Sequence, residues 1–267
     1  MRGNSASAET QGRRPCVFVT GASSGLGAAF ARHYAALGAT LGLAARRSDK
    51  LRALADSLPA KSYLYPLDVT DAGALREAGT DFIARAGVPD VVIANAGVSV
   101  GTLTEEADDL AAFERVLAVN VTGMANTFHP FVAPMRAARR GRLAGIASVA
   151  GIRGIPGAGA YGASKAAAIS YLESLRVELR GTGVRVVTLA PGYIATPMTD
   201  VNPYPMPFML DADEAARRMA RVIAAGRSYA VVPWQMAIVA KLMRMLPDAL
   251  YDRLSAQAGR KPRGLRL

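Results

Sequence analysis

The strongest constraint on the fold is a regular alternation of short apolar runs with longer alanine-rich stretches. The short runs are rich in valine, leucine and isoleucine and contain few polar residues, which is typical of strands buried on both faces. Such strands, joined by helices, form a parallel sheet that helices cover on both sides. We therefore predict one doubly wound α/β domain with a parallel sheet of about seven strands. The predicted strands cover residues 16–20, 39–45, 62–69, 90–97, 141–151, 184–191 and 228–233, and the predicted helices cover 27–38, 49–58, 71–86, 108–137, 161–179, 211–226 and 234–246.

The composition agrees with an ordinary globular protein. Of 267 residues, 51% are hydrophobic and 20% are charged, so the chain is long enough to bury one large core. The single cysteine, Cys16, excludes an internal disulfide framework and fits a reducing compartment, so we predict a cytoplasmic protein. Residues 1–14 lack the apolar core of a signal peptide and are predicted to form a disordered tail. No run of about 18 uncharged apolar residues occurs, which predicts no membrane-spanning helix.

The chain is strongly basic, with a net charge of +11 and a pI near 10.2. The excess lies in scattered arginines and at the two ends, where aromatic residues do not interleave with the cations to form a stacking groove. We therefore predict no nucleic-acid partner, although a positive surface also attracts anionic ligands and lipid headgroups. The basic residues at the ends include Arg13, Arg14, Arg260, Lys261, Arg263 and Arg266.

A glycine-rich segment, TGASSGLG at residues 20–27, follows the first predicted strand and opens the first helix. Gly21, Gly25 and Gly27 allow a tight turn and let an anion approach the backbone closely. The start of the helix offers unpaired N–H groups and positive dipole character to a pyrophosphate. Because the segment lies between a strand and a helix, we favour a dinucleotide-binding loop over a plain strand–helix turn.

The end of the second strand indicates which dinucleotide is bound. An acidic residue at this place would hydrogen-bond a ribose 2′-hydroxyl and repel a 2′-phosphate. Here Ala45 occupies the place and is followed by Arg46 and Arg47. A guanidinium binds a phosphate as a fork, so the pair favours NADP over NAD. The alternative is two solvated arginines at the start of a helix.

The segment YGASK places Tyr161 and Lys165 four residues apart. On a helix this spacing stacks the two side chains on one face, one turn from each other. An acid–base pair needs this arrangement, but an ordinary exposed helix surface has the same spacing. Only the other motifs of the chain decide between an acid–base pair and an ordinary helix surface.

Together the motifs resemble the short-chain dehydrogenase/reductase family over about residues 14–234. TGASSGLG is similar to the family's cofactor loop, and YGASK is similar to its Tyr-x-x-x-Lys pair. The resemblance implies a catalytic Rossmann-like NADP(H)-binding domain at 15–234 with a substrate loop at 193–212, followed by an apolar helix and a basic tail at 235–267. The other similar segments are LDVT with Asp68, NAG at 95–97, VNVTG with Asn120, GIASVAG with Ser148, and PGYIATPM at 191–198.

The resemblance implies hydride transfer between NADP(H) and a carbonyl or alcohol, with catalytic roles for four residues. Tyr161 would be the general acid in reduction and the general base in oxidation, with Lys165 and the oxidised nicotinamide lowering its pKa. Lys165 would also hydrogen-bond the nicotinamide ribose. Ser148 would donate to the substrate oxygen as charge develops on it, and Asn120 would hold a water that connects Lys165 to solvent. The alternative is a non-catalytic NADP-binding regulatory protein on the same fold.

The resemblance also implies which residues contact the cofactor. The glycine loop would hold the pyrophosphate, Asp68 would meet the adenine, and Ile194 and Thr196 would face the nicotinamide carboxamide. No metal site is predicted. The full set of cofactor-binding residues is Gly21, Ser23, Ser24, Gly25, Leu26, Gly27, Arg46, Arg47, Asp68, Val69, Asn95, Ala96, Gly97, Tyr161, Lys165, Pro191, Gly192, Ile194 and Thr196.

The predicted substrate pocket is mostly apolar. No arginine or lysine is placed by the motifs to hold a carboxylate or a phosphate, which predicts a small apolar ketone, aldehyde or secondary alcohol as the substrate. The expected substrate-binding residues are Ser148, Val149, Ile155, Tyr161, Tyr193 and Met198, together with Val98 and the loop 202–210.

The C-terminal part departs from the family pattern. Many members end in a TGQ…VDGG strand that helps to build a tetramer, whereas this chain has SYAVVPWQMAIVAKLMRML followed by a basic tail. We therefore expect a homodimer, formed through helices at about 108–137 and 161–180, rather than a tetramer. The apolar segment 234–246 has three alternatives: core or dimer packing, a lid over an apolar substrate, or attachment to a membrane surface.

Overall fold

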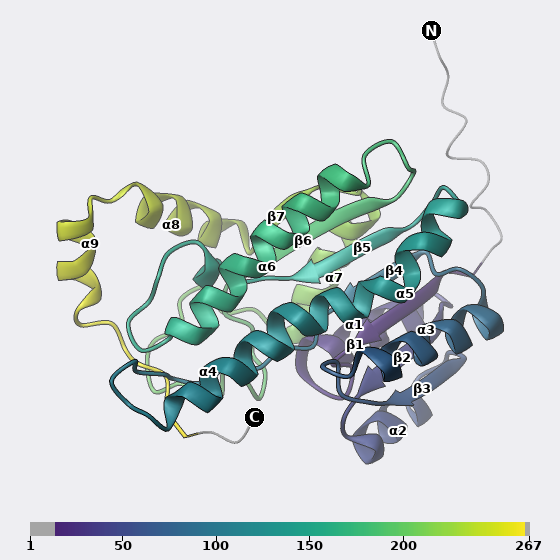
Figure 1. The fold of residues 1–267 in the computed structure, drawn as a ribbon, viewed down its shortest axis with the longest axis horizontal. Coiled ribbons are helices and arrows are strands. Elements are labelled where there is room, and N and C mark those ends of the chain that lie inside the picture. The colour runs from purple at the N-terminus through teal and green to yellow at the C-terminus, as the bar shows by residue number, and fades with distance from the viewer. Residues whose placement is uncertain (1–13, 265–267) are drawn as a thin grey trace, which may run out of the picture.

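The computed structural model describes residues 14–264, and this part of the chain contains a parallel sheet of seven strands (Figure 1). Their order is β3-β2-β1-β4-β5-β6-β7, which confirms the predicted doubly wound sheet. The predicted disordered tail lies outside the described residues except for Arg14, as do the last residues of the basic tail. The strands are β1 (Cys16–Thr20), β2 (Thr40–Ala45), β3 (Ser62–Pro66), β4 (Val91–Ala94), β5 (Arg142–Ile146), β6 (Arg185–Pro191) and β7 (Tyr229–Val232).

The strand order reverses next to β1. The chain adds β2 and β3 on one side of β1, then returns to place β4 on the other side and continues outward to β7. The segments that leave β1 and β4 therefore diverge at the carboxyl edge of the sheet. A crevice at such a reversal point is the usual ligand-binding place of an open α/β sheet.

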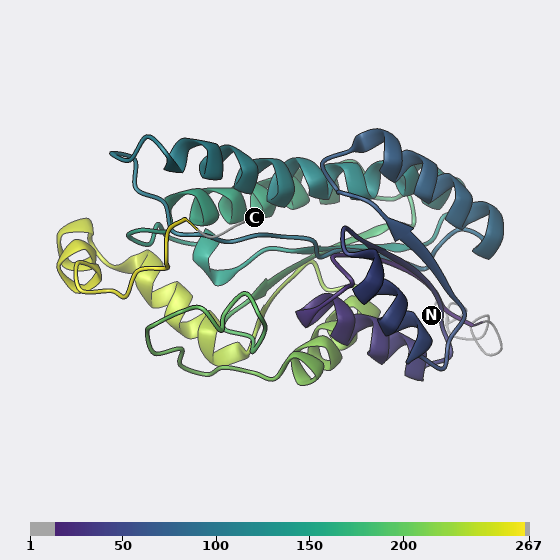
Figure 2. The ribbon, with the colours of Figure 1, turned by 90° about the horizontal axis from the view of Figure 1, so that it is seen from below.

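Helices cover both faces of the sheet (Figure 2). Within β1, Val17 and Val19 pack on one face and Phe18 packs on the other, because successive strand residues point to opposite sides. The Phe18 ring lies 4.9 Å from that of Phe131 and 5.4 Å from that of Phe82, measured between centroids. The first face is covered by α1 (Gly25–Ala36), α2 (Ser48–Asp56) and α7 (Ala212–Ala224), and the second by α3 (Ala72–Ala86), α5 (Gly123–Ala137) and α6 (Gly159–Glu178).

The helix predicted at 108–137 consists of three segments. An α-helix, α4 (Asp109–Leu117), is followed by a π-helical turn, η1 (Ala118–Thr122), and then by α5. Asn120 lies inside the π turn and is completely buried. Single π turns within α-helices are found mostly at functional sites, so this interruption, which residue periodicity does not reveal, marks a place of interest.

The C-terminal part folds back along the carboxyl edge of the sheet. Helix α8 (Trp234–Met245) confirms the predicted helix, and a further helix, α9 (Asp248–Ser255), was not predicted. After α9 the chain returns toward the start of α4 (Figure 1), where the N–H of Gly101 donates to the carbonyl of Pro262 at 2.9 Å. The proline-rich segment 202–210 is a loop, as predicted. A short 3₁₀ turn, η2 (Val149–Gly151), precedes α6.

One face of α8 is an exposed apolar stripe. Trp234 and Met245, at its two ends, are 64% and 71% exposed. Only Met236 and Ala240 of this helix are buried, so core packing explains two of its residues and not the stripe. None of the helices in residues 14–264 has the length and apolar character that crossing a membrane requires. The four residues of the stripe are Trp234, Ile238, Leu242 and Met245.

Candidate active site

The glycine loop lies between β1 and α1, and its backbone requires glycine. Gly21 and Gly25 have φ angles of 65° and 53°, in the left-handed region that other residues rarely adopt. A Cβ on Gly27 would lie 2.2 Å from the carbonyl oxygen of Gly21, so the first turn of α1 packs directly on the loop. The side chain of Ser24 does not cap α1, which leaves N–H groups of the first turn without a side-chain partner from the N-cap.

Arg47 connects the end of β2 to this loop. Its Nη2 donates to Oγ of Ser23 at 3.0 Å and to Oγ of Ser24 at 2.7 Å. The exposed guanidinium therefore lies beside the glycine loop, at the strand end where the sequence predicts recognition of a 2′-phosphate. Arg46 lines the same cleft.

Thr20 and Asn95 hold the ends of β1 and β4 together. The hydroxyl of Thr20 accepts from the N–H groups of Asn95 at 3.2 Å and Ala96 at 3.3 Å, and Asn95 Nδ2 donates to the carbonyl of Thr20 at 3.0 Å. Thr20 is completely buried and is a positioning residue that the sequence analysis missed. A threonine ending a strand carries no local signal for this role.

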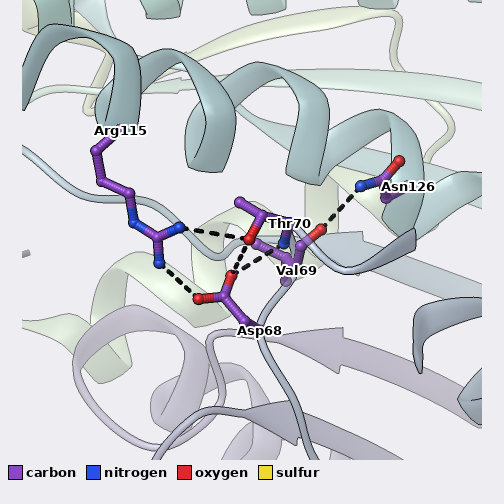
Figure 3. Close-up of polar contacts among 5 residues, drawn as sticks. All are labelled: Asp68, Val69, Thr70, Arg115 and Asn126. Atoms are coloured by element: carbon purple, nitrogen blue, oxygen red, sulfur yellow. Dashed lines mark hydrogen bonds and ion pairs between the residues drawn. The ribbon is translucent and has the colours of Figure 1, made fainter. Parts of the chain in front are cut away.

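A hydrogen-bonding network around Asp68 fixes the segment that follows β3, at one wall of the cleft (Figure 3). Its carboxylate accepts from the N–H and the hydroxyl of Thr70, each at 2.9 Å, and from Nη2 of Arg115 at 2.5 Å. Partial burial acts to raise the pKa of Asp68, but these hydrogen bonds lower it overall. Asn126 Nδ2 donates to the carbonyl of Val69 at 3.0 Å. Side chains from α4 and α5 thus fix the position of the segment that follows β3. The spacing of the sequence motifs did not reveal these two supporting residues, Arg115 and Asn126.

Asn120 connects three parts of the site. Its Oδ1 accepts from the N–H of Val98 at 2.8 Å, and its Nδ2 donates to the carbonyl of Val98 at 3.0 Å and to Oγ of Ser164 at 2.9 Å. Ser164 lies on α6, next to Lys165. The buried amide therefore joins the segment after β4 to the helix that carries the Tyr-x-x-x-Lys pair.

Tyr161 and Lys165 lie on one face of α6, as predicted. The ammonium of Lys165 is 5.7 Å from the centroid of the Tyr161 ring and donates to the carbonyl of Ile146 at 2.8 Å. Ser148, at the N-cap of η2, is buried beside Tyr161 and hydrogen-bonds its phenol. The structure thus brings together Ser148, Tyr161 and Lys165, with Asn120 one hydrogen bond away through Ser164.

Burial controls the protonation of the pair. It lowers the pKa of Lys165, which is only 4% exposed, to about 8. Burial also raises the pKa of Tyr161, and the hydrogen bond with Ser148 acts in the opposite direction without reversing it. The sequence-based expectation of a lowered tyrosine pKa is therefore not met in the protein alone, because burial is the largest effect on the Tyr161 pKa. The phenol is protonated near neutral pH, the form that donates a proton.

The segment after β6 closes the opposite wall of the cleft. Thr199 Oγ1 donates to the carbonyl of Ile194 at 2.6 Å and accepts from the N–H of Thr196 at 3.0 Å. Ile194 also forms an isolated parallel bridge with Leu210. A Cβ on Gly25 would lie 3.1 Å from Cγ2 of Thr196, so this wall approaches the glycine loop closely.

These walls enclose a cleft of about 540 Å³ at the reversal point of the sheet. It contains an anion cradle at the glycine loop, a guanidinium fork at the end of β2 and Tyr161 at the far end. The set therefore fits a dinucleotide. Every predicted cofactor residue except Gly27 lines it, namely Gly21, Ser23, Ser24, Gly25, Leu26, Arg46, Arg47, Asp68, Val69, Asn95, Ala96, Gly97, Tyr161, Lys165, Pro191, Gly192, Ile194 and Thr196.

The predicted substrate residues do not all line one hollow. Val98, Tyr161 and Met198 line the main cleft, whereas Ser148, Val149 and Tyr193 line neither this cleft nor the second hollow. Ile155 lines a separate hollow of about 390 Å³ against α9. The ring of Tyr193 lies 6.5 Å from that of Tyr204, in the proline-rich loop.

The structure contradicts the expectation that the substrate region lacks a cation. Lys261, from the tail predicted to be a solvated surface, is buried with its ammonium 6.0 Å from the centroid of the Tyr161 ring. Its sequence position, 100 residues after the tyrosine, gave no signal of this contact.

Comparison with known proteins identifies the family. The model of the short chain dehydrogenase family matches residues 15–204. The chain belongs to this family. An uncharacterized oxidoreductase of Myxococcus xanthus is 40% identical over 237 residues, which is 88% of this chain and 93% of the relative.

Solved structures of family members agree with this fold. A short-chain dehydrogenase from Streptomyces avermitilis is 25% identical, with a TM-score of 0.76 over 91% of this chain and 96% of its own. An alcohol dehydrogenase from Thermococcus sibiricus, complexed with 5-hydroxy-NADP, is 27% identical, with a TM-score of 0.72 over 82% of this chain and 95% of its own. The chain is thus an oxidoreductase of the short-chain dehydrogenase type.

Gly27→Ala tests the close packing of the glycine loop. The added Cβ would overlap the carbonyl oxygen of Gly21, so α1 must move away from the loop. We expect a loss of about 1–3 kcal/mol in the free energy of unfolding, measured by urea denaturation, and at least tenfold weaker binding of NADPH. Gly154→Ala is the control, because its Cβ would meet no atom within 4 Å. Equal behaviour of the two variants would contradict the packing argument.

Proposed function

We propose that the chain is an NADP(H)-dependent oxidoreductase that interconverts a small carbonyl compound and the corresponding alcohol. The observation that carries the proposal is that one cleft is lined by Tyr161 and Lys165, with Ser148 beside the phenol, and by a glycine loop with an arginine beside it. The sequence-based prediction of an apolar substrate used the lack of a nearby cation as one of its arguments. The buried ammonium of Lys261 removes this argument.

The residues of the cleft supply the binding functions. The N–H groups of the glycine loop and of the first turn of α1 would hold the pyrophosphate, and Arg47 would hold the 2′-phosphate as a fork. Asp68 and Val69, which are fixed from α4 and α5, would flank the adenine. Bound NADP(H) would supply or accept the hydride.

Tyr161 is the proton donor in the direction of reduction. Its phenol is buried and protonated, and its hydrogen bond with Ser148 places it where a carbonyl oxygen can bind both hydroxyl groups. As the carbonyl carbon is reduced, negative charge develops on the oxygen, Ser148 donates to it, and Tyr161 transfers its proton to it. In the reverse direction, the tyrosinate removes the proton from the alcohol.

Lys165 restores the proton and stabilises the tyrosinate. Its ammonium is held by the carbonyl of Ile146 on the same face of α6 as the phenol, so its charge favours the deprotonated tyrosine. A pKa near 8 lets this lysine exchange protons near neutral pH. Asn120 fixes the backbone around Val98 and, through Ser164, the helix turn that bears Lys165, and we propose that a water in this region connects the lysine to solvent.

The alternative function, a non-catalytic NADP-binding regulatory protein, needs no protonated phenol paired with a serine and a buried lysine. All three groups are present, and Ser148 and Lys165 are buried, which favours catalysis because burying an ammonium costs free energy that a purely structural role does not require.

Tyr161→Phe tests the catalytic assignment. The variant keeps the ring and loses the transferable proton, so we expect kcat for carbonyl reduction to fall by about 10²–10⁴-fold while NADPH binding, followed by fluorescence titration, stays within threefold. Tyr171→Phe, on the same helix, is the control and should retain activity. Near-wild-type kcat in Tyr161→Phe would disprove the assignment.

Arg47→Leu tests the cofactor preference. The loss of a charge-assisted fork to a 2′-phosphate is worth about 1.5–3 kcal/mol, so we expect KM for NADPH to rise about 10–150-fold with little change in KM for NADH. Arg52→Leu, an exposed change on α2, controls for the lost charge. A strong preference of the wild-type protein for NADH would overturn the assignment of Arg47.

We further propose that the apolar stripe of α8 contacts a membrane surface, while a dimer forms through α4 and α6. The stripe is exposed, and Lys241 and Arg244 on the same helix are exposed cations that suit anionic headgroups. Exposed Leu110 and Phe113 on α4 support the dimer surface.

Flotation with anionic liposomes tests the membrane contact. We expect the wild-type chain to float with the vesicles and Ile238→Glu to remain in the soluble fraction, because a carboxylate in the stripe opposes insertion among headgroups. Leu110→Glu on α4 is the matched control and should still float. Equal flotation of both variants, or none by the wild type, would contradict the proposal.

A further inference from the structure

The segment that follows α9 forms a strap across the substrate side of the site. The N–H of Gly101 donates to the carbonyl of Pro262 at 2.9 Å, and a Cβ on Gly101 would lie 2.1 Å from the carbonyl oxygen of Lys261. A Cβ on Gly259 would lie 2.4 Å from Cβ of Tyr204. The strap, residues 257–264, therefore packs between the segment after β4 and the proline-rich loop, with contacts that leave no room for a side chain at Gly101 or Gly259.

Two ion pairs hold the end of the strap. Arg263 Nε donates to Oδ2 of Asp109 at 2.7 Å, and its Nη1 donates to Oε1 of Glu106 at 2.9 Å. Asp109 is itself buried and accepts from the N–H of Leu103 at 2.8 Å. The strap is thus attached at the start of α4 by a charged side chain with defined geometry, and its position is a property of the fold.

This attachment places Lys261 against two residues that line the main cleft. The residue is 9% exposed, and its ammonium donates to the carbonyl of Met198 at 3.1 Å, 6.0 Å from the centroid of the Tyr161 ring. Met198 and Tyr161 both line the main cleft. Two buried lysines, Lys165 and Lys261, therefore lie beside the proton donor, and only Lys165 belongs to the family's catalytic set.

The charge of Lys261 is not neutralised by the protein. Among residues 14–264 no carboxylate forms an ion pair with it, and one backbone carbonyl is its hydrogen-bond acceptor. An ammonium has three donor positions, so two remain for other acceptors. Burial lowers the pKa of Lys261 to about 8, which shows that the protein alone does not compensate the lost hydration of this cation.

We propose that Lys261 is a substrate-binding residue that selects carbonyl compounds bearing a carboxylate close to the reacting carbon. The inference rests on the proposed function and names the substrate class of that site. A carboxylate would accept the two free donor positions and supply the missing negative charge. Since the ammonium lies next to the ring of the proton donor, the carboxylate and the carbonyl of the substrate are separated by only a few bonds. A short oxo acid, or the corresponding hydroxy acid, has this form.

A single ammonium favours a carboxylate over a phosphate group. A phosphate dianion carries more charge and more acceptor positions than one lysine satisfies, and protein sites for it combine several donors, usually arginine or helix N–H groups. In the described part of the chain, the donors of that kind in the cleft belong to the glycine loop and to Arg46 and Arg47, which follow β1 and β2, whereas Lys261 contacts the segment after β6.

The test compares acids with their methyl esters. Short 2-oxo and 3-oxo acids of three to six carbons and their esters are supplied to the full-length protein with NADPH, and the ratio of kcat/KM for acid over ester is measured. We expect the wild-type protein to prefer one of the acids, and Lys261→Met, which keeps the apolar stem, to lower that ratio at least tenfold. Arg260→Met, the exposed neighbouring cation, is the control and should keep the ratio. Gly101→Val, which displaces the strap, should lower it as Lys261→Met does.

The outcomes separate this inference from the proposed function. If the wild-type protein reduces esters as well as acids, or if Lys261→Met keeps the preference, the inference is wrong while the oxidoreductase assignment stands. If no carbonyl is reduced, calorimetric binding of the same acids to the NADPH-saturated protein is measured. If the wild-type protein binds one of the acids and Lys261→Met does not, the inference about Lys261 is supported and only the proposed oxidoreductase function is overturned. Neither turnover nor acid binding would overturn both.

Discussion

The geometry of the site depends on one buried amide. Asn120 has both polar atoms of its side chain in hydrogen bonds, two with the backbone of Val98 and one with Ser164. It thereby ties the segment after β4 to α6, across elements that have no strand pairing with each other. Asn120 lies within the π turn, where hydrogen bonds run from residue i to residue i+5 instead of i+4, and its side chain is completely buried. Leaving one polar atom of this buried amide without a hydrogen bond would cost about 1–3 kcal/mol in the free energy of folding, so the observed arrangement is strongly favoured.

Two buried cations lie in or beside the candidate active site. Lys165 and Lys261 are both almost inaccessible, and both have a pKa of about 8 because burial disfavours the charged form. Such groups destabilise the folded chain at pH values where they are protonated, since the unfolded chain hydrates them fully. The fold tolerates them because other elements contribute ample apolar burial, with Phe18, Phe82 and Phe131 fully buried at the centre of one face of the sheet. The lysines are therefore better explained by chemistry than by stability.

Much of the fold and of the cofactor cleft could be predicted from the sequence, because both follow from local patterns. Continuous apolar strands predicted the parallel sheet, and the glycine loop required its φ angles at Gly21 and Gly25. The segment TGASSGLG and the YGASK pair were recognisable because they occur in order with the other motifs that resemble the family. The edges of predicted elements differ from the structure by a few residues, as helix and strand ends usually do.

What could not be predicted depends on contacts between residues distant in sequence. Arg115 reaches Asp68 from 47 positions away, and Thr20 meets Asn95 from 75 positions away. Hydrophobic periodicity predicts one continuous helix here and gives no sign of the π turn, after which Gly123 packs closely against Val69. The pKa of Tyr161 was predicted from a neighbouring charge, whereas its direction is decided by burial, a quantity that spacing does not report.

The attachment of the strap has a consequence for how such a site diversifies. The family model ends at residue 204, whereas the strap begins more than fifty residues later. The residues proposed for hydride transfer and the lysine proposed to bind the substrate therefore lie in separate stretches of the sequence. A recombination event that exchanges only the last stretch would leave the sheet, the glycine loop and the tyrosine intact while presenting a different side chain to the substrate. Substrate specificity would then change through the last stretch of the sequence alone.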